Sequence, residues 1–413
     1  MPTEVDNKKR VDSLFTDWTD LFTRYKNDAN LFNLVKLYQH VLDVNDTEIA
    51  NSIYIVLNDP AVFAWRVESA LNSAIEQVVV TSDSKRFDTA YVEGFIRVAY
   101  KAGDKLLALK GLNPLNPFLD QQNFRRGSEA VRFWFHIATA AEIKQGYMKG
   151  ELVPDILPWD TGYFVCANDN KGLALTGYKT TRSKDKILTE HPEAVNVKEG
   201  TEIEVLYILT REVSELWISG EQVKKLPNLL GYVPVVYRRV PVGSMLLDKE
   251  SIKYRGESGL FLLRDLIPEL NRLVSISQSL NLQELDHALQ LRKPKDSFTP
   301  DGANIPTVDE ATKPGTVNEV ELPGGYDKMP IGELRAQADL LHKMIQERVD
   351  RVMSNFQNFP APRTATEILA LSQEQDITTL PRLANRGLLK QDGAGMINKQ
   401  TNAECENSGI REF

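Results

Sequence analysis

Residues 259–280 read GLFLLRDLIPELNRLVSISQSL, and this stretch decides the fold that we expect. Its leucines recur every three or four positions, which is the period of a helix with one apolar stripe. Pro268 favours a kink or a new helix start, because proline removes an amide donor from a helix interior. A second stripe through residues 331–354 predicts another helix, ending near Ser354. The intervening residues 293–330 contain six prolines and four glycines, and predict a small projecting element rather than a structureless loop.

The chain before this helix pair changes character at Pro154. Residues 1–150 show three-and-four spacing of apolar residues, which predicts helices, including one over 126–147. Over 203–209 the apolar residues Ile203, Val205, Tyr207 and Leu209 instead recur at every second position, beside Glu202 and Glu204, which predicts a half-buried strand. A further strand is expected over 233–237, where Pro234 favours either a sheet edge or the first residue of the strand. Together with turn-rich neighbours these patterns predict an antiparallel β region and an α+β fold.

After the second helix the composition is that of a loop with a helix start. Residues 355–363 contain two prolines and several asparagines. Thr364-Ala365-Thr366-Glu367 has the spacing of a capping box, in which the threonine and glutamate side chains bind each other's backbone amides. We expect the helix that follows to be limited by Pro381, and the chain from Gln391 onward to be a frayed polar tail.

Composition excludes several function classes. The 49 basic and 57 acidic residues give a net charge of −8, which argues against coating nucleic acid through a basic surface but not against letting it slide past. Cys166 and Cys405 are too few for a disulfide framework or a thiolate zinc site. No apolar leader and no apolar run of about 18 residues is present, so we expect neither a secretion signal nor a transmembrane helix.

Catalytic chemistry finds little support in the sequence. The histidines are scattered without the spacing of metal ligands or of a catalytic pair, so we expect no catalytic residues, no metal and no cofactor. One alternative is a nucleotide-dependent enzyme that uses the Gly172–Thr180 loop, although Tyr178 separates the second glycine from Lys179. A second alternative is a monomeric adaptor or scaffold protein that binds partners through the two long helices.

Four features follow one another over about residues 150–385. They are β-rich sequence ending in NLLGYVPVV (228–236), the long helix of 259–291 with a Pro/Gly-rich segment after it, PGTV (314–317) with the return helix from MPI (329–331), and RTATEI (363–368). In this order they resemble the portal, or head–tail connector, proteins of tailed bacteriophages. TATEI alone is a capping box that any helix could use, so the order carries the resemblance.

The resemblance implies a portal-like α+β fold with a reduced or absent crown. Its regions would be a helical wing at 1–150, a β-rich wing at 151–245, a first stem helix at 246–292, a clip at 293–330, a second stem helix at 331–354, a tunnel loop at 355–364, a post-loop helix at 365–385 and a polar tail at 386–413.

The implied function is non-enzymatic. The chain would form a homo-oligomeric ring of about twelve subunits at one capsid vertex of the virion, assembled in the host cytoplasm. The ring would be the DNA channel for viral genome packaging and ejection. Its partners would be double-stranded DNA, the packaging terminase ATPase, the major capsid and scaffold proteins and the tail adaptor proteins, with no membrane involved.

The resemblance and the stripes together nominate four sets of site residues. They are the channel loop Asn355, Gln357, Asn358, Arg363 and Thr364; the signature cap Thr364, Thr366 and Glu367; the clip residues Lys293, Lys295, Asp301 and Asp309; and the stem interface Leu270, Leu273, Leu334, Leu341 and Ile345.

Overall fold

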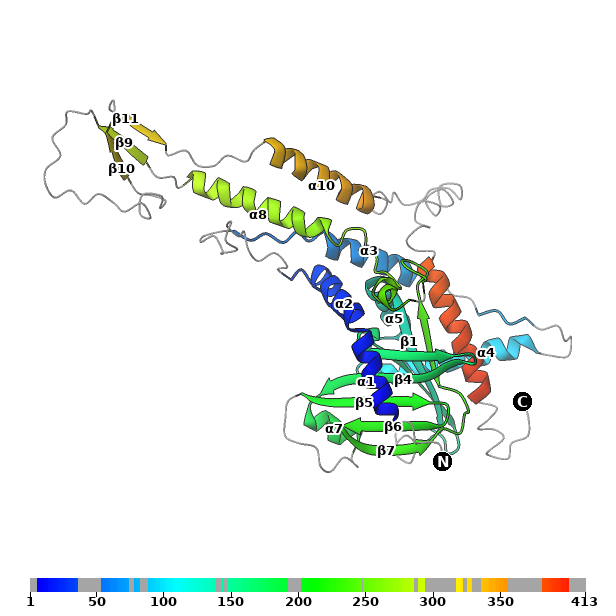
Figure 1. Ribbon diagram of the computed structural model, residues 1–413. Coiled ribbons are helices and arrows are strands. Elements are labelled where there is room, and N and C mark those ends of the chain that lie inside the picture. Colours follow the sequence, from blue (N-terminus) through cyan, green and yellow to red (C-terminus); the bar gives the residue numbers. More distant parts are fainter. Residues whose placement is uncertain are drawn as a thin grey trace, which may run out of the picture. The chain divides into compact units, whose positions relative to one another are not determined.

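The computed structural model describes residues 6–35, 53–73, 78–81, 88–138, 143, 147–191, 202–246, 248–285, 289–293, 317–321, 325–328, 336–354 and 381–400 (Figure 1). The chain divides into two compact units. Unit 1 comprises Met1–Phe32, Val62–Phe261 and Phe359–Phe413, and unit 2 comprises Asn33–Ala61 and Leu262–Asn358. The described part of the chain mixes helices and strands, which confirms the α+β class.

Unit 1 contains most of the elements. Its helices are α1 (Asn7–Asp17), α2 (Thr19–Phe32), α4 (Thr89–Leu109), α5 (Leu115–Arg126), α7 (Lys184–Glu190), the short turns η1 (Thr161–Tyr163) and η2 (Lys249–Tyr254), a helix over 381–400 and most of α3 (Asp59–Ser73). Its strands are β1 (Ser128–Ile137), β2 (Leu152–Trp159), β3 (Phe164–Asp169), β4 (Gly172–Arg182), β5 (Ile203–Thr210), β6 (Val213–Ile218), β7 (Glu221–Pro227) and β8 (Val235–Arg239).

The larger sheet of unit 1 is an antiparallel meander in the order β3-β4-β5-β6-β7. Successive side chains of a strand point to opposite faces, and here both faces are covered. Ile203 and Val205 of β5 pack with Ile187 of α7, whereas Leu206 and Ile208 share a core with α1 and α2. The strand predicted over 203–209 is therefore confirmed, and it is apolar on both faces because both are covered.

The smaller sheet has the antiparallel order β2-β1-β8, and it corrects one prediction. The helix expected over 126–147 is wrong, because α5 ends at Arg126 and β1 follows. Gly127 makes this change of direction with a φ of +65°, and a side chain there would collide with the carbonyl oxygen of Gly256. β8 is an edge strand, which is one of the two positions that Pro234 favoured.

A second correction concerns the C-terminal region. The polar tail expected over 386–413 is wrong for residues 386–400, which belong to the helix over 381–400 in unit 1, drawn in red in Figure 1. The helix expected before Pro381 lies outside the described residues, and Pro381 is the first described residue of the helix over 381–400. A proline is tolerated in a first helical turn, whose amides need no intrahelical acceptor. The buried side of this helix follows helical spacing with mostly polar residues: Arg382, Asn385, Arg386, Leu389, Gly393, Ile397 and Gln400.

The described residues of unit 2 include two long helices that pack on one another and a small sheet. The helices are α8 (Leu266–Leu285) and α10 (Ala336–Ser354), so the two predicted long helices are confirmed over these residues. The first helix was expected to extend over 259–291, and this is wrong for residues 289–291, which belong to a strand. Pro268 lies in the first turn of α8, where a new helix start was one of the two expectations. Between them come β9 (Leu289–Lys293), β10 (Val317–Glu321) and β11 (Gly325–Lys328), with β9 in the centre, parallel to β10 and antiparallel to β11.

Candidate functional site

The residues nominated for a stem interface occupy different environments on the two helices of unit 2. Leu270 of α8 and Ile345 of α10 are buried, and Leu273 is half-buried. Leu341 of α10 is exposed, whereas Leu334 lies outside the described residues. The apolar stripe of α10 is therefore divided between residues that are buried within this single chain and residues that are not.

The exposed part of that stripe forms one flank of α10. Leu340, Leu341 and Met344 retain 59, 48 and 46% of their accessible surface. Residues three and four positions apart are neighbours on a helix surface, so these three side chains form a continuous apolar strip, which we call the α10 flank. Ile345 and Val349, on the adjacent side of the same helix, are buried. The α10 flank is thus exposed apolar surface beside the buried side of the same helix.

An extended segment, residues 53–57, is attached to α8 by a regular set of hydrogen bonds that we call the polar ladder. Every second amide of the segment donates to every fourth side chain of the helix: Ile53 N to Ser279 Oγ at 2.8 Å, Ile55 N to Ser275 Oγ at 2.9 Å, and Leu57 N to Asn271 Oδ1 at 3.1 Å. Two strand residues advance about 6.6 Å and four helical residues about 6.0 Å, so the spacings match. The segment therefore runs antiparallel to α8.

The polar ladder explains why polar residues are buried on α8. Asn271, Ser275 and Ser279 are all buried. A buried hydroxyl or amide without a hydrogen-bond partner would be costly, and here each one accepts from a backbone amide. None of the three groups carries a charge, so the attachment is made entirely of neutral hydrogen bonds.

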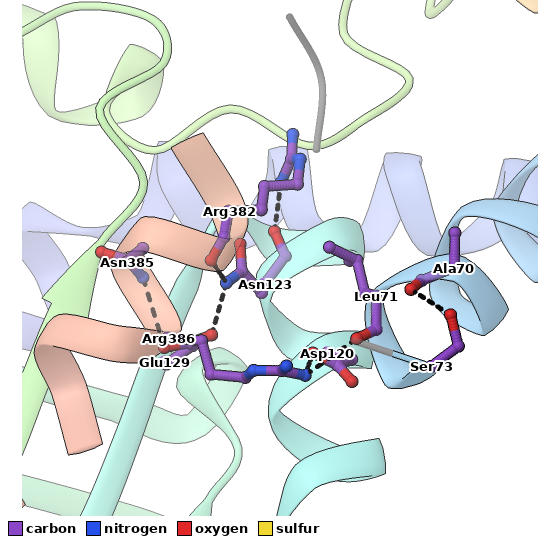
Figure 2. Close-up of polar contacts among 9 residues, drawn as sticks. All are labelled: Ala70, Leu71, Ser73, Asp120, Asn123, Glu129, Arg382, Asn385 and Arg386. Carbon is purple, nitrogen blue, oxygen red and sulfur yellow. Dashed lines mark hydrogen bonds and ion pairs between the residues drawn. The ribbon is translucent and has the colours of Figure 1, made fainter. Parts of the chain in front are cut away.

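In unit 1, the helix over 381–400 meets α5, α3 and β1 through six polar residues that we call the buried cluster: Asp120, Asn123, Glu129, Arg382, Asn385 and Arg386 (Figure 2). Arg386 forms an ion pair with Asp120 and also donates to the carbonyl oxygen of Leu71, in the last turn of α3, at 3.2 Å. A cation at this position meets the negative end of that helix.

The guanidinium of Arg382 binds backbone rather than a carboxylate. It donates to the carbonyl oxygens of Asn123 and Glu257, the latter at 3.1 Å, and it lies 5.3 Å above the ring of Phe124. The side-chain amide of Asn123 in turn donates to the carbonyl oxygen of Arg382 at 2.8 Å. This reciprocal pair fixes the first turn of the described helix against the C-terminal part of α5.

Glu129 of β1 is fully buried and contacts amides instead of cations. Its two oxygens accept from the side-chain amides of Asn123 at 2.5 Å and Asn385 at 3.3 Å. Burial, which disfavours the charged form, raises the pKa of Glu129 to about 8. Burial likewise lowers the pKa of Arg382 to about 10. The cluster thus contains a carboxyl group that is mostly neutral at pH 7.

The remainder of the helix over 381–400 docks through apolar contacts and backbone groups. Leu389 and Ile397 are completely buried in a core with Phe133 of β1. Gln400 donates to the carbonyl oxygen of Phe133 at 2.9 Å, and Tyr100 of α4 donates to that of Lys390 at 3.0 Å. Docking is therefore continuous along the described helix.

Most of the other nominated residues lie outside the described residues. These are the channel loop and cap, from Asn355 to Glu367, and the clip residues Lys295, Asp301 and Asp309. Lys293 is the last residue of β9. Among the described residues no group of His, Cys, Asp or Glu is arranged to hold a metal ion. In the same residues no helix is long and apolar enough to cross a membrane.

The segment proposed as a phosphate loop has no loop geometry. Residues 172–180 form most of β4, which pairs with β3 on one side and β5 on the other. Its backbone amides face neighbouring strands, whereas a phosphate loop needs several amides turned toward one anion. The observation that suggested a nucleotide site is therefore explained by a central strand.

Neither the polar ladder nor the buried cluster was predicted from the sequence. The serines of α8 at 275 and 279 repeat at the helical spacing, and Arg382 and Arg386 do the same in the C-terminal helix. Each repeat reads as a solvated helix face when the packing is unknown.

No protein-family model matches this chain, and no curated protein sequence shows significant similarity to it.

Proposed function

We propose that this chain is a portal-type subunit, which forms a ring that conducts double-stranded DNA at a capsid vertex. The observation that carries the proposal is the order of elements in unit 2: a long helix, a small sheet made from widely separated segments, and a second long helix packed on the first. This order matches the stem–clip–stem arrangement implied by the motif resemblance. In this proposal α8 and α10 are the stem, and β9, β10 and β11 belong to the clip.

The α10 flank supports assembly of several copies. Leu340, Leu341 and Met344 form an apolar strip that nothing in a single chain covers among the described residues. In a closed ring each copy presents one surface to the next copy and receives a different one, so such a strip would be buried in every subunit. The packaging ATPase, the tail adaptors and the capsid proteins are further partners that the proposal assigns to the ring.

Size and shape of the purified protein test this proposal. Light scattering should give a mass of about twelve chains, and negative-stain images should show rings with a central channel. A monomer at all concentrations would reject the proposal and favour the adaptor alternative. ATP turnover by the purified chain alone would instead favour the enzyme alternative.

A pair of variants then tests whether the α10 flank joins the subunits. Leu341→Asp should replace rings by smaller species, because it places a charge in a desolvated contact at a cost of several kcal/mol. Val98→Asp, at an exposed aliphatic residue of α4 outside the α10 flank, introduces the same side chain and should leave rings intact. Equal assembly of both variants would show that the α10 flank is not an interface.

A further inference from the structure

The helix over 381–400 is attached to unit 1 through a carboxyl group that has no cation bonded to it. Glu129 is fully buried, and among the described residues its two oxygens accept hydrogen bonds only from the amides of Asn123 and Asn385. Asn385 belongs to the docked helix, whereas Glu129 and Asn123 belong to the surface that receives it. The protonation state of Glu129 therefore affects the contact between the helix over 381–400 and the rest of unit 1.

The other charged groups around Glu129 are already engaged. Arg386 pairs with Asp120, and Arg382 donates to two backbone carbonyl oxygens. Arg238, opposite Glu129 in β8, pairs with Asp392 of the docked helix. Burial and the negative charge of Asp120 oppose ionisation of Glu129, whereas the positive charges of Arg386 and Arg382 favour it. An ionised Glu129 would thus be a buried charge without a cation in contact.

A neutral Glu129 is readily accommodated. A protonated carboxyl group donates one hydrogen bond, and it needs an acceptor. The Asn385 amide donates only to Glu129 among the contacts described here, and a rotation of that amide would present its oxygen to the acid proton instead. The neutral form then keeps two hydrogen bonds, one from the Asn123 amide and one to Asn385.

We propose that the helix over 381–400 is a proton-controlled latch, which is held on unit 1 while Glu129 is neutral and is loosened when Glu129 ionises. This inference does not depend on the proposed function.

The direction of the pH dependence follows from linkage. An undocked, solvated Glu129 has the ordinary pKa of 4.5, and the docked one has a pKa of about 8. Docking therefore takes up a proton between these two values, and the docking equilibrium falls by up to about tenfold for each pH unit gained in this window. Above about pH 8 both states are ionised and the dependence levels off.

Hydrogen exchange of the full-length protein tests the latch. After correction for intrinsic exchange rates, the protection of amides in 385–397 should fall by up to about a hundredfold from pH about 6 to about 8. In Glu129→Gln, which keeps the shape but cannot ionise, protection of the same amides should be independent of pH over that range. A matched control, Glu68→Gln, alters a partly exposed pair with Arg125 and should behave as the unmodified protein.

The comparison with Glu129→Gln also removes pH effects that do not come from Glu129. Equal pH dependence in both proteins, or constant protection in the unmodified protein, would overturn the proposal. If Glu129→Gln does not fold, the carbon-13 shift of the Glu129 carboxyl in the unmodified protein decides the question. A titration midpoint near 8 supports the latch, and one near 4.5 rejects it.

Discussion

Two segments of the chain, one in each unit, are attached through hydrogen bonds between side chains and backbone groups. One attachment is neutral, and the other contains charged groups. In unit 2, residues 53–57 are attached to α8 by the polar ladder, which is neutral. In unit 1, the helix over 381–400 is attached by the buried cluster, which contains two arginines and two carboxyl groups. Both attachments satisfy backbone groups of a remote segment with side chains. The two attachments therefore have the same structural role, and we expect them to differ in free energy, cooperativity and pH dependence.

The difference arises from the cost of removing a partner. A neutral hydrogen bond contributes only about 0.5–1.5 kcal/mol, because water competes for both groups in the unfolded chain. A buried ion pair contributes little net energy, but removal of one partner leaves an uncompensated charge in the interior. The polar ladder should lose its bonds singly and additively, whereas the buried cluster should fail as a unit.

The largest effect is expected for Arg386→Ala. The substitution leaves the fully buried Asp120 without its cation and should destabilise unit 1 by about 3–5 kcal/mol. All five tryptophans belong to unit 1, so tryptophan fluorescence during urea unfolding measures this unit alone. The matched control is Arg125→Ala, whose pair with Glu68 is partly exposed and should contribute about 0–1 kcal/mol. Similar losses of unfolding free energy in the two variants would contradict the expected difference between a buried and a partly exposed ion pair.

The next effect comes from the packing of the same helix. A Cβ at Gly393 would lie 2.4 Å from Phe133 Cζ and 2.8 Å from the hydroxyl of Tyr100. Gly393→Ala should therefore destabilise unit 1 by about 1–3 kcal/mol through overpacking. Gly395→Ala meets no atom within 4 Å and should stabilise the helix, by up to about 1 kcal/mol, because alanine has the higher helix propensity. Equal effects would mean that residue 393 does not pack against β1.

These two positions also show why the C-terminal helix was not predicted from sequence. A search for apolar residues at helical spacing depends on an apolar buried face. Here the buried face begins with Arg382, Asn385 and Arg386 and includes Gly393. The buried positions therefore follow the helical period, whereas the apolar residues do not. The helices of unit 2 were predictable because leucine, isoleucine and valine recur along them at helical spacing, although α8 also buries Asn271, Ser275 and Ser279.

The strand β1 was mispredicted for a different reason. Its aromatic and aliphatic residues also fit a short helical stripe, and periodicity alone does not distinguish the two over such a length. The signal that decides is Gly127, which ends α5 with a positive φ just before the strand begins. The polar ladder could not be predicted at all, because it joins positions more than 200 residues apart along the chain.

A smaller effect is expected for one rung of the polar ladder. Ser275→Ala removes the acceptor of the Ile55 amide and should lower the local free energy of opening by about 1 kcal/mol. The hydrogen-exchange protection of that amide should fall about fivefold, since 1.4 kcal/mol corresponds to tenfold. Ser277→Ala, between the rungs on α8, is the control and should leave that amide unchanged. Loss of protection in both variants would indicate general weakening of α8.

The smallest effect is the response of this rung to solution conditions, and it separates the two attachments most directly. The three acceptors of the polar ladder are two hydroxyls and one amide, none of which titrates between pH about 6 and 8. The loss caused by Ser275→Ala should therefore be the same, within about 0.3 kcal/mol, at both pH values and at low and high salt.

Over the same pH range unit 1 should lose stability as the pH rises, because the raised pKa of Glu129 makes its folded form take up a proton there. Hydrogen exchange of the Ile55 amide, corrected for intrinsic rates, measures the first quantity, and tryptophan fluorescence measures the second. A pH-dependent loss at Ile55 would mean that a charged group acts on the polar ladder, and the proposed division between a neutral and a charged attachment would be wrong.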